Sequence, residues 1–333
     1  MKVVTVRGSF REIGRGAGEE LRSQARAGLE IFEAGLRRDP AARDRWRRRL
    51  PTMLETAKRF CPETLEEIEG FAEGAGLDLE RVLWVNFPSY PHDYDFETGC
   101  TNVAFAAGPA GPLLGKNNDG SRPEEKVPPA VVRSYPERGI PTIRFLLTGW
   151  IAQGDALNAE GLAMGHSSVG SVFQQSDHHP TIRMWVYEGH RRCKTVAEFT
   201  HWMAMTPTRG KGYSFLLADA GGTLGSLEAP CPLVQVRRPA EGARAMNCVN
   251  YYQLPALAEA DRRSPEGKIN ARARAKLLEE RVGGLPESEL TVGKMKETLR
   301  YHGAPSVCRH GGADASYTEF SYIAVCREAK ALF

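Results

Sequence analysis

The sequence predicts an α+β fold in which antiparallel sheets lie between helices, and two patterns carry this prediction. Residues 17–86 place apolar side chains at helical spacing, whereas the chain after Cys100 consists of short apolar stretches separated by turn-forming residues. Strands that follow one another as hairpins, with long helices between or after them, favour antiparallel sheets covered by helices over a doubly wound parallel sheet. At 333 residues, 41% of them hydrophobic, the chain is long enough to bury a large core.

The N-terminal part is expected to be helical after one short strand at residues 1–8. Pro40 interrupts the helical pattern, Pro62 suits the first position of a further helix, and Asp78 can cap a helix over 79–86. The apolar positions that define these helices are Leu21, Ala25, Leu29, Phe32, Leu36, Trp46, Leu50, Leu54, Ala57, Leu65, Ile68 and Phe71. Residues 90–99 are polar and aromatic with few helix formers, so we expect an extended linker there.

Beyond Cys100 the pattern predicts strands joined by tight turns. The candidate strands are 101–106, 112–117, 130–134, 142–147, 155–158, 162–166, 213–218, 223–228, 244–250 and 320–325. Turn-forming residues at 158–161 and 219–222 separate two pairs of these strands. Helical patterns at 182–204, 270–281 and 293–302 lie between or after the hairpins.

Composition and charge limit the classes of partner. The net charge of +3 is too small for this length to indicate nucleic acid binding, and we interpret the arginine-rich run at 37–49 as a solvated helix face, with phosphate or RNA binding as the alternative. The seven cysteines show no CxxC spacing, which favours reduced thiols over disulfides or a zinc ribbon. No signal peptide and no apolar run of about 20 residues is evident, so we expect a soluble cytoplasmic protein without a membrane partner.

The junction between Gly99 and Cys100 is the most informative point of the sequence, because it separates the helical part from the hairpins. If the bond before Cys100 were cut, the new α-amine, with a reference pKa near 7.7–8.0, could act as the base for the thiol of the same residue. Gly99 leaves the carbonyl group that the thiol would attack unobstructed. The alternative is a buried core cysteine, since cysteine is among the most buried residue types.

Four further residues complete a candidate catalytic group. Lys116 and Asp119 follow on the second arm of the first hairpin, where a cation favours a thiolate and a carboxylate can orient an α-ammonium group. Asn250 ends an apolar strand and could donate its amide to an oxyanion, and Arg309 could hold a carboxylate. Each has a structural alternative: Asp119 as a turn residue, Asn250 as a strand-end cap and Arg309 as a surface arginine.

With these residues, the chain resembles the autoproteolytic acyltransferases and amidohydrolases related to isopenicillin-N acyltransferase. This family belongs to the N-terminal-nucleophile hydrolases. The resemblance runs nearly end to end and rests on several moderately specific motifs in the right order. They are 7–18 (RGSFREIGRGAG), 65–76 (LEEIEGFAEGAG), 78–86, 99–101 (GCT), 113–119 (LLGKNND), 158–162 (NAEGL), 216–222 (LLADAGG) with Glu228, and 307–310 (VCRH).

The resemblance implies an αββα sandwich of two stacked, mainly antiparallel sheets between helical layers. It implies self-cleavage into a helical pro-segment, 1–99, and a catalytic part, 100–333, which stay associated as one compact unit. Carried over by position, Cys100 is the nucleophile, Asp119 its polar partner, Asn250 an oxyanion donor and Arg309 a site arginine.

The chain departs from the family pattern at three positions. Lys116 stands where arginine is usual, Gly120 where tryptophan is common and Tyr251 where histidine often follows the asparagine. Lys116 keeps the charge but loses the bidentate fork of arginine. The departures at Gly120 and Tyr251 affect the pocket wall, so they put the substrate class in question rather than the reaction type. Lys116, Tyr251 and His166, which could face the pocket or lie satisfied in the core, are the candidate substrate-binding residues.

Two other motifs resemble sites for a metal or a nucleotide but lack parts of the pattern. The loop 177–179 (DHH) offers metal-binding side chains but lacks a partner at ligand spacing, so we expect no metal there. The glycines at 14, 16 and 18 follow a short strand but lack the third glycine position of a dinucleotide fingerprint and a following βαβ pattern. We therefore expect no cofactor, although a coenzyme A thioester stays open as an acyl donor.

The sequence thus supports an amidohydrolase or acyltransferase that cleaves a small amide, or transfers its acyl group, through an acyl-cysteine intermediate after self-cleavage between Gly99 and Cys100. The expected partners are a small-molecule substrate and the two pieces of the chain itself. The competing hypothesis is an uncleaved, non-catalytic protein that binds a small ligand on the same scaffold.

Overall fold

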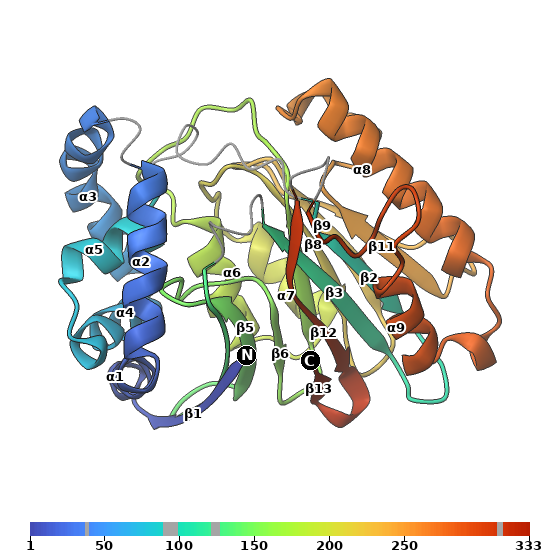
Figure 1. Cartoon of the computed structure of the whole chain (residues 1–333), viewed down its shortest axis with the longest axis horizontal. Helices are drawn as coiled ribbons and strands as arrows, with labels where there is room; N and C mark the ends of the chain where they lie inside the picture. Colours follow the sequence, from blue (N-terminus) through green and yellow to red (C-terminus); the bar gives the residue numbers. More distant parts are fainter. Residues whose placement is uncertain (37–39, 89–98, 121–126, 312–315) are drawn as a thin grey trace.

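The computed structural model describes residues 1–36, 40–88, 99–120, 127–311 and 316–333. It shows two stacked sheets with helices on their outer sides (Figure 1). This α+β arrangement of sheets between helices confirms the fold class expected from the sequence. The predicted linker at 90–99 lies, except for Gly99, outside the described residues.

The N-terminal part is a strand followed by a helical layer. The elements are β1 (Lys2–Gly8), α1 (Phe10–Glu20), α2 (Arg22–Leu36), α3 (Pro40–Phe60), α4 (Pro62–Ala75) and α5 (Leu79–Asn86), the blue and cyan group of Figure 1. Pro62 begins α4 and Asp78 caps α5 through its side chain, as predicted. Pro40 begins a helix rather than only ending one.

The glycine motif at 14–18 serves helix packing. A side chain on Gly14 would lie 2.0 Å from the backbone oxygen of Glu67 in α4, and one on Gly70 would lie 2.1 Å from the backbone oxygen of Arg11 in α1. Glycine at these positions lets the backbones of α1 and α4 approach closely, which explains the motif without a bound nucleotide.

The larger sheet has eight strands in the order β1-β4-β5-β6-β7-β8-β9-β10. Its strands after β1 are β4 (Pro129–Pro136), β5 (Thr142–Leu147), β6 (Ala156–Asn158), β7 (Ala163–Ser168), β8 (Tyr213–Ala218), β9 (Leu224–Ala229) and β10 (Gln235–Arg237). Its neighbours are antiparallel apart from β1 and β4, which run parallel. The helices α6 (Ile182–His190) and α7 (Val196–Ala204) replace the single helical run expected at 182–204.

The smaller sheet carries the predicted site. It has the order β11-β2-β3-β12-β13, with β2 (Thr101–Phe105), β3 (Leu113–Gly120), β11 (Ala245–Val249), β12 (Tyr317–Val325) and β13 (Lys330–Leu332), all antiparallel. The hairpin of β2 and β3 is the one predicted after Cys100, whereas the short strands β10 and β13 were not predicted.

Alternation along β2 and β3 gives this sheet two apolar faces. Ala104 and Leu114 join the large core shared with the eight-stranded sheet, whereas Val103, Phe105 and Leu113 join a second core. The second core lies beneath α8 (Pro265–Leu278) and α9 (Val292–Leu299), drawn in orange and red in Figure 1. Because both faces are covered, polar groups at the end of this sheet are held in a dry environment.

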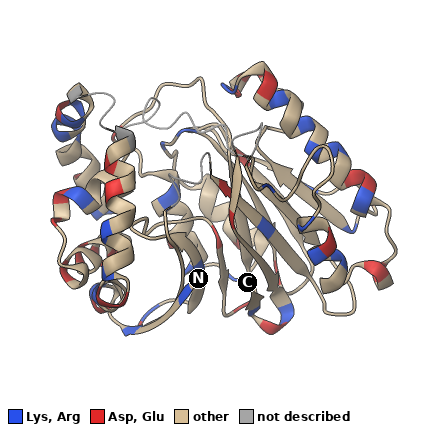
Figure 2. Cartoon of the chain, viewed as in Figure 1, with Lys and Arg blue, Asp and Glu red and all other residues tan. Residues whose placement is uncertain are grey.

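Both signs of charge are mixed on the outer helices, and the strands are largely uncharged (Figure 2). Within the arginine-rich run, Arg43 and Arg47 lie 2.9 and 2.7 Å from the Glu80 carboxylate, and Arg49 pairs with Asp177 at 2.6 Å. These intramolecular pairs fit a solvated helix face. Among the described residues, no helix is long and apolar enough to cross a membrane.

Candidate active site

Cys100 lies at the start of β2 and is 3% exposed. Its Sγ atom is 3.9 Å from Oδ1 of Asn118 and 3.9 Å from the backbone oxygen of Asp119. The hairpin explains both contacts, because Thr101 pairs with Asn117 and continuing this register sets Cys100 and Gly99 beside Asn118 and Asp119. The bond before Cys100 therefore lies next to Asp119, the predicted polar partner of the nucleophile.

Arg274, on α8, holds the carbonyl group of Gly99. Its Nη1 atom lies 2.8 Å from the backbone oxygens of both Gly99 and Cys100 and 3.0 Å from Oγ1 of Thr101. Its Nη2 atom donates to Oδ1 of Asn250 at 2.9 Å. The side chain is fully buried, and burial, with the charge of Arg309 nearby, lowers the pKa of Arg274 to about 9. A buried cation thus faces the carbonyl group that a thiol at Cys100 would attack.

Arg309 also packs against Gly99. A Cβ atom on Gly99 would lie 2.4 Å from Cζ of Arg309 and 2.6 Å from its Nη1, so the site accommodates only glycine without rearrangement. The guanidinium group donates from Nη2 to Oδ1 of Asn270 at 2.7 Å, and the same oxygen accepts from Nε of Arg274 at 3.0 Å. Asn270 and Arg274 stand four residues apart on one face of α8, so one amide oxygen holds both arginines in place.

Asp119, in β3, is 3% exposed and lies between these groups. Its Oδ1 atom accepts a hydrogen bond from Oγ1 of Thr318 at 2.7 Å, and its Oδ2 atom is 3.6 Å from Nε of Arg309. Burial raises the pKa of Asp119, although Thr318 and the arginines oppose the shift. In the described part of the chain Oδ2 has no hydrogen-bond donor. This buried oxygen could accept a hydrogen bond from the α-ammonium group that cleavage before Cys100 would create.

Asn250 follows β11 and is fully buried. Arg274 donates to its Oδ1 atom, and an arginine side chain has no acceptor, so the amide must point its Nδ2 atom away from Arg274. Nδ2 donates to the backbone oxygen of Ser168 at 2.8 Å. An amide nitrogen carries two hydrogens, so a second donor remains for a ligand oxygen.

Lys116 belongs to a buried ion pair on the opposite face of the sheet. Its Nζ atom donates to the backbone oxygen of His166 and lies 3.4 Å from Oδ1 of Asp155, and both ends of this pair are fully buried. Burial acts to lower the pKa of Lys116, but the charges of Asp155 and Cys100 outweigh it and the net shift is upward. The ammonium group therefore stays charged and contributes positive potential at Cys100.

His166 lies in β7 and contacts the same carboxylate. Its Nδ1 atom is 3.0 Å from Oδ2 of Asp155, and its backbone nitrogen donates to Oδ1 at 3.0 Å. Burial lowers the pKa of His166 to about 4, so the ring is neutral at pH 7. Lys116 and His166 thus meet at the buried carboxylate of Asp155.

Tyr251 and Gly120 lie at the edge of the candidate site. Tyr251 is half-buried, packs against the core beneath α8, and accepts a hydrogen bond from Gln253 at 3.4 Å. A Cβ atom on Gly120 would lie 2.6 Å from a carboxylate oxygen of Glu319, so a larger residue there requires the Glu319 side chain to move. Asp177, in the loop considered for a metal, uses both carboxylate oxygens to bind Arg49.

The structure brings Gly99, Cys100, Asp119 and Arg309 together, and it links Asn250 to them through Arg274. Three further residues of the cluster were missed in the sequence: Arg274, Asn270 and Asp155. Arg274 and Asn270 lie in the helix predicted at 270–281, and their spacing of four residues was the available signal. Asp155 gave no signal, because its partners come from two different sheets.

No family model matches the chain, and no curated protein matches it in sequence. Solved structures do match it. An ortholog of N-acylethanolamine-hydrolyzing acid amidase from Caenorhabditis elegans has a TM-score of 0.51 at 11% identity, covering 70% of this chain and 99% of that chain. Penicillin V acylase from Agrobacterium tumefaciens has a TM-score of 0.45 at 14% identity, covering 67% and 79%. A variant of conjugated bile acid hydrolase from Clostridium perfringens has a TM-score of 0.46 at 12% identity, covering 68% and 87%.

At such low identity the likeness concerns the fold alone. Together with the two stacked sheets and their helices, the first of these comparisons shows that this chain has an α+β fold similar to that of the nematode protein.

Proposed function

We propose that this protein is an N-terminal-cysteine amidohydrolase that cuts its own bond between Gly99 and Cys100 and then hydrolyses a small amide. The observation that carries the proposal is the position of Arg274, whose Nη1 atom lies 2.8 Å from the carbonyl oxygen of Gly99. A buried cation at that oxygen stabilises the negative charge that develops when a nucleophile adds to the carbonyl carbon. A structural cysteine in a core strand would not need this arrangement.

Self-cleavage follows from this geometry in two steps. The Cys100 sulfur adds to the carbonyl carbon of Gly99, its proton passes to the departing nitrogen, and the carbon–nitrogen bond breaks to leave a thioester. Water then adds to the thioester and releases the carboxylate of Gly99 and the free thiol and α-amine of Cys100. Arg274 stabilises the oxyanion in both steps, and Arg309 fixes the backbone of Gly99 through the contact with its Cα position.

The new α-amine turns Cys100 into its own base. Asp119 is suited to orient it, because its buried Oδ2 atom has no hydrogen-bond donor among the described residues and the continued register of β2 and β3 sets Asp119 beside Gly99. The amine removes the thiol proton, and Lys116 on the other face favours the resulting thiolate through its charge.

Substrate turnover repeats the chemistry of maturation on a foreign carbonyl group. The thiolate adds to the amide carbon, the amine of the substrate leaves with a proton from the α-ammonium group, and water hydrolyses the acyl-cysteine. We assign the oxyanion to the second N–H of Asn250, held in orientation by Arg274, and to Arg274 itself. Such donors typically contribute about 10²–10³-fold each to the rate.

The nematode protein with a similar fold is an amidase by name, which agrees with an amide as the substrate class.

Mass spectrometry of purified protein tests the proposal. We expect wild-type protein to give two pieces of 99 and 234 residues that copurify, and Cys100→Ala to give one piece of 333. Cys248→Ala, which removes another buried thiol, is the matched control and should be cleaved normally. An intact wild-type chain would overturn self-cleavage and favour the non-catalytic ligand-binding protein.

Release of amines from a panel of N-acyl amides then tests turnover. We expect hydrolysis by the cleaved wild type and none by Cys100→Ala. A cleaved protein that releases no amine from any acyl class would overturn the assignment as an amidohydrolase and leave self-cleavage standing.

A further inference from the structure

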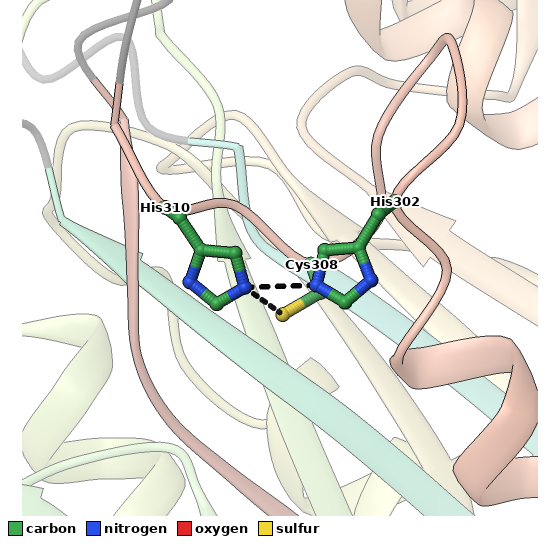
Figure 3. A group of neighbouring side chains, drawn as sticks. All are labelled: His302, Cys308 and His310. Atoms are coloured by element: carbon green, nitrogen blue, oxygen red, sulfur yellow. Dashed lines mark hydrogen bonds between the residues drawn. The ribbon is translucent and has the colours of Figure 1, made fainter.

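Three metal-binding side chains meet in the loop between α9 and β12, outside the catalytic group. They are His302, Cys308 and His310, and their ligand atoms all lie within 4.8 Å of one another (Figure 3). Nε2 of His302 is 2.8 Å from Nε2 of His310, which in turn is 3.8 Å from Sγ of Cys308. Both histidines are exposed, and the cysteine is half-buried.

The loop is folded so that these three side chains converge. The backbone oxygen of Tyr301 accepts hydrogen bonds from the backbone nitrogens of Val307 and Cys308, at 3.0 and 2.9 Å, which closes the loop between His302 and Cys308. The two imidazole rings are nearly parallel, at 16°, with their centroids 4.9 Å apart. A proton shared between the two rings would explain the short distance between their Nε2 atoms. It would not explain why the Cys308 thiol also points toward Nε2 of His310.

We propose that His302, Cys308 and His310 bind one divalent transition-metal ion of the Zn²⁺ class, with a fourth position open to water. Imidazole and thiolate are the ligands that zinc prefers, whereas magnesium and calcium require oxygen ligands, which this cluster does not contain. Binding releases the thiol proton and any proton shared by the rings to water.

The distances fit this ion after a small adjustment. With bonds of about 2.0–2.1 Å to nitrogen and about 2.3 Å to sulfur, tetrahedral coordination separates two nitrogens by about 3.3 Å and a nitrogen from sulfur by about 3.5 Å. The two nitrogens must therefore part by about 0.5 Å and the sulfur must approach His310 by about 0.3 Å. Exposed side chains on a loop can make such movements by rotation about their χ angles.

The site would also restrain a catalytic residue, because Arg309 lies between two of the ligands in the chain. The backbone nitrogen of Arg309 donates to Oγ1 of Thr318 at 2.9 Å, and its backbone oxygen accepts from the backbone nitrogen of Thr318 at 2.9 Å. An ion held by Cys308 and His310, the residues before and after Arg309, would restrain this segment in addition to the two hydrogen bonds with Thr318. Metal binding itself does not depend on self-cleavage or on amide hydrolysis.

Titration of the full chain with Co²⁺ after removal of bound metal tests the proposal. We expect one equivalent to bind with the d–d absorption of a four-coordinate ion and a thiolate-to-cobalt charge-transfer band, and Zn²⁺ to displace it. Cys308→Ser should lose the charge-transfer band, and His302→Ala or His310→Ala should weaken binding by about 100-fold or more, since changes around a ligand alone cost 10–100-fold.

Two control variants separate this site from other candidate ligands. His178→Ala removes an exposed histidine from the other histidine-containing loop, and Cys100→Ala removes the proposed nucleophile; both should titrate like wild type. Equal binding by wild type and Cys308→Ser, or loss of the charge-transfer band in Cys100→Ala, would overturn the assignment. A stoichiometric complex without any thiolate band would overturn it as well.

Discussion

The contact between Gly99 and Arg309 gives the sharpest test of how the cleavage site is built. In Gly99→Ala the new Cβ atom would lie 2.4, 2.6 and 2.8 Å from Cζ, Nη1 and Nε of Arg309, whereas ordinary contacts of a Cβ atom are 3.4–4 Å. One of the two groups must move by about 1 Å. Arg309 is 7% exposed and held by Asn270, so it has little room to retreat.

The expected effect is slower self-cleavage with little change in stability. A displacement of about 1 Å at reacting atoms can cost about 10²-fold in rate, which is about 2.7 kcal/mol of activation free energy. The rate can be followed by synthesising the chain in a cell-free system and measuring, over time, the fraction converted into pieces of 99 and 234 residues. Gly284→Ala is the matched control, because nothing lies within 4 Å of a Cβ atom there.

A double-variant cycle identifies the cause of the effect. If the clash with the guanidinium group slows cleavage, then Gly99→Ala should cost much less in an Arg309→Ala background than in the wild type. Equal slowing by Gly99→Ala in both backgrounds would refute the proposed contact. Wild-type rates for Gly99→Ala would refute the geometry of the whole cleavage site.

Three further predictions concern buried charges. Arg274→Lys keeps a positive charge but loses the paired N–H donors of the guanidinium group. Self-cleavage should therefore slow by about 10²–10³-fold while the circular dichroism spectrum stays unchanged. An unaltered cleavage rate would exclude Arg274 from the reaction. Lys116→Met leaves the buried Asp155 carboxylate without its lysine counter-ion, beside the neutral His166 ring, and should lower the free energy of unfolding in urea by about 3–5 kcal/mol; adding Asp155→Asn should restore most of it. Burial lowers the pKa of His190 to about 4, below the 6.5 of an unfolded chain, so the unfolded state binds more protons and stability is lost as pH falls through this range. Between pH 7 and 5 the wild type should lose about 2 kcal/mol more than His190→Gln, and identical pH profiles would contradict a buried neutral ring.

Local patterns predicted most of the fold because they act over a few residues. Alternating apolar residues located β2 and β3, and Pro62 at the first helical position and the N-cap Asp78 located the starts of α4 and α5. The break between α6 and α7 was missed, because the apolar spacing continues across residues 191–195. The strands β10 and β13 are three residues each, too short to show a period.

Sequence reasoning could propose site residues only where neighbouring positions or a short hairpin register connect them. Cys100 after Gly99, and Asp119 on the facing arm of the hairpin, stand out because a short register connects them. No local sequence pattern predicts that Arg274 is buried, because an arginine in a helix of mixed polarity is normally solvated. Only the packing of α8 on the five-stranded sheet buries it. Tertiary burial, rather than residue type, gives this arginine its role.

The electrostatics of the uncleaved chain favour the proposed attack on the bond between Gly99 and Cys100. On one side of the sheet, Asp119 is the carboxylate of the described residues that Arg274 and Arg309 face, and burial raises its pKa. On the other side Lys116 is already balanced by Asp155. The described residues around Gly99 therefore carry an excess of buried positive charge, and the lowered pKa of Arg274 reflects the cost of burying it. Negative charge on the carbonyl oxygen of Gly99, 2.8 Å from Arg274, would offset that cost, so the folded chain favours the tetrahedral intermediate over the resting amide more strongly than water does.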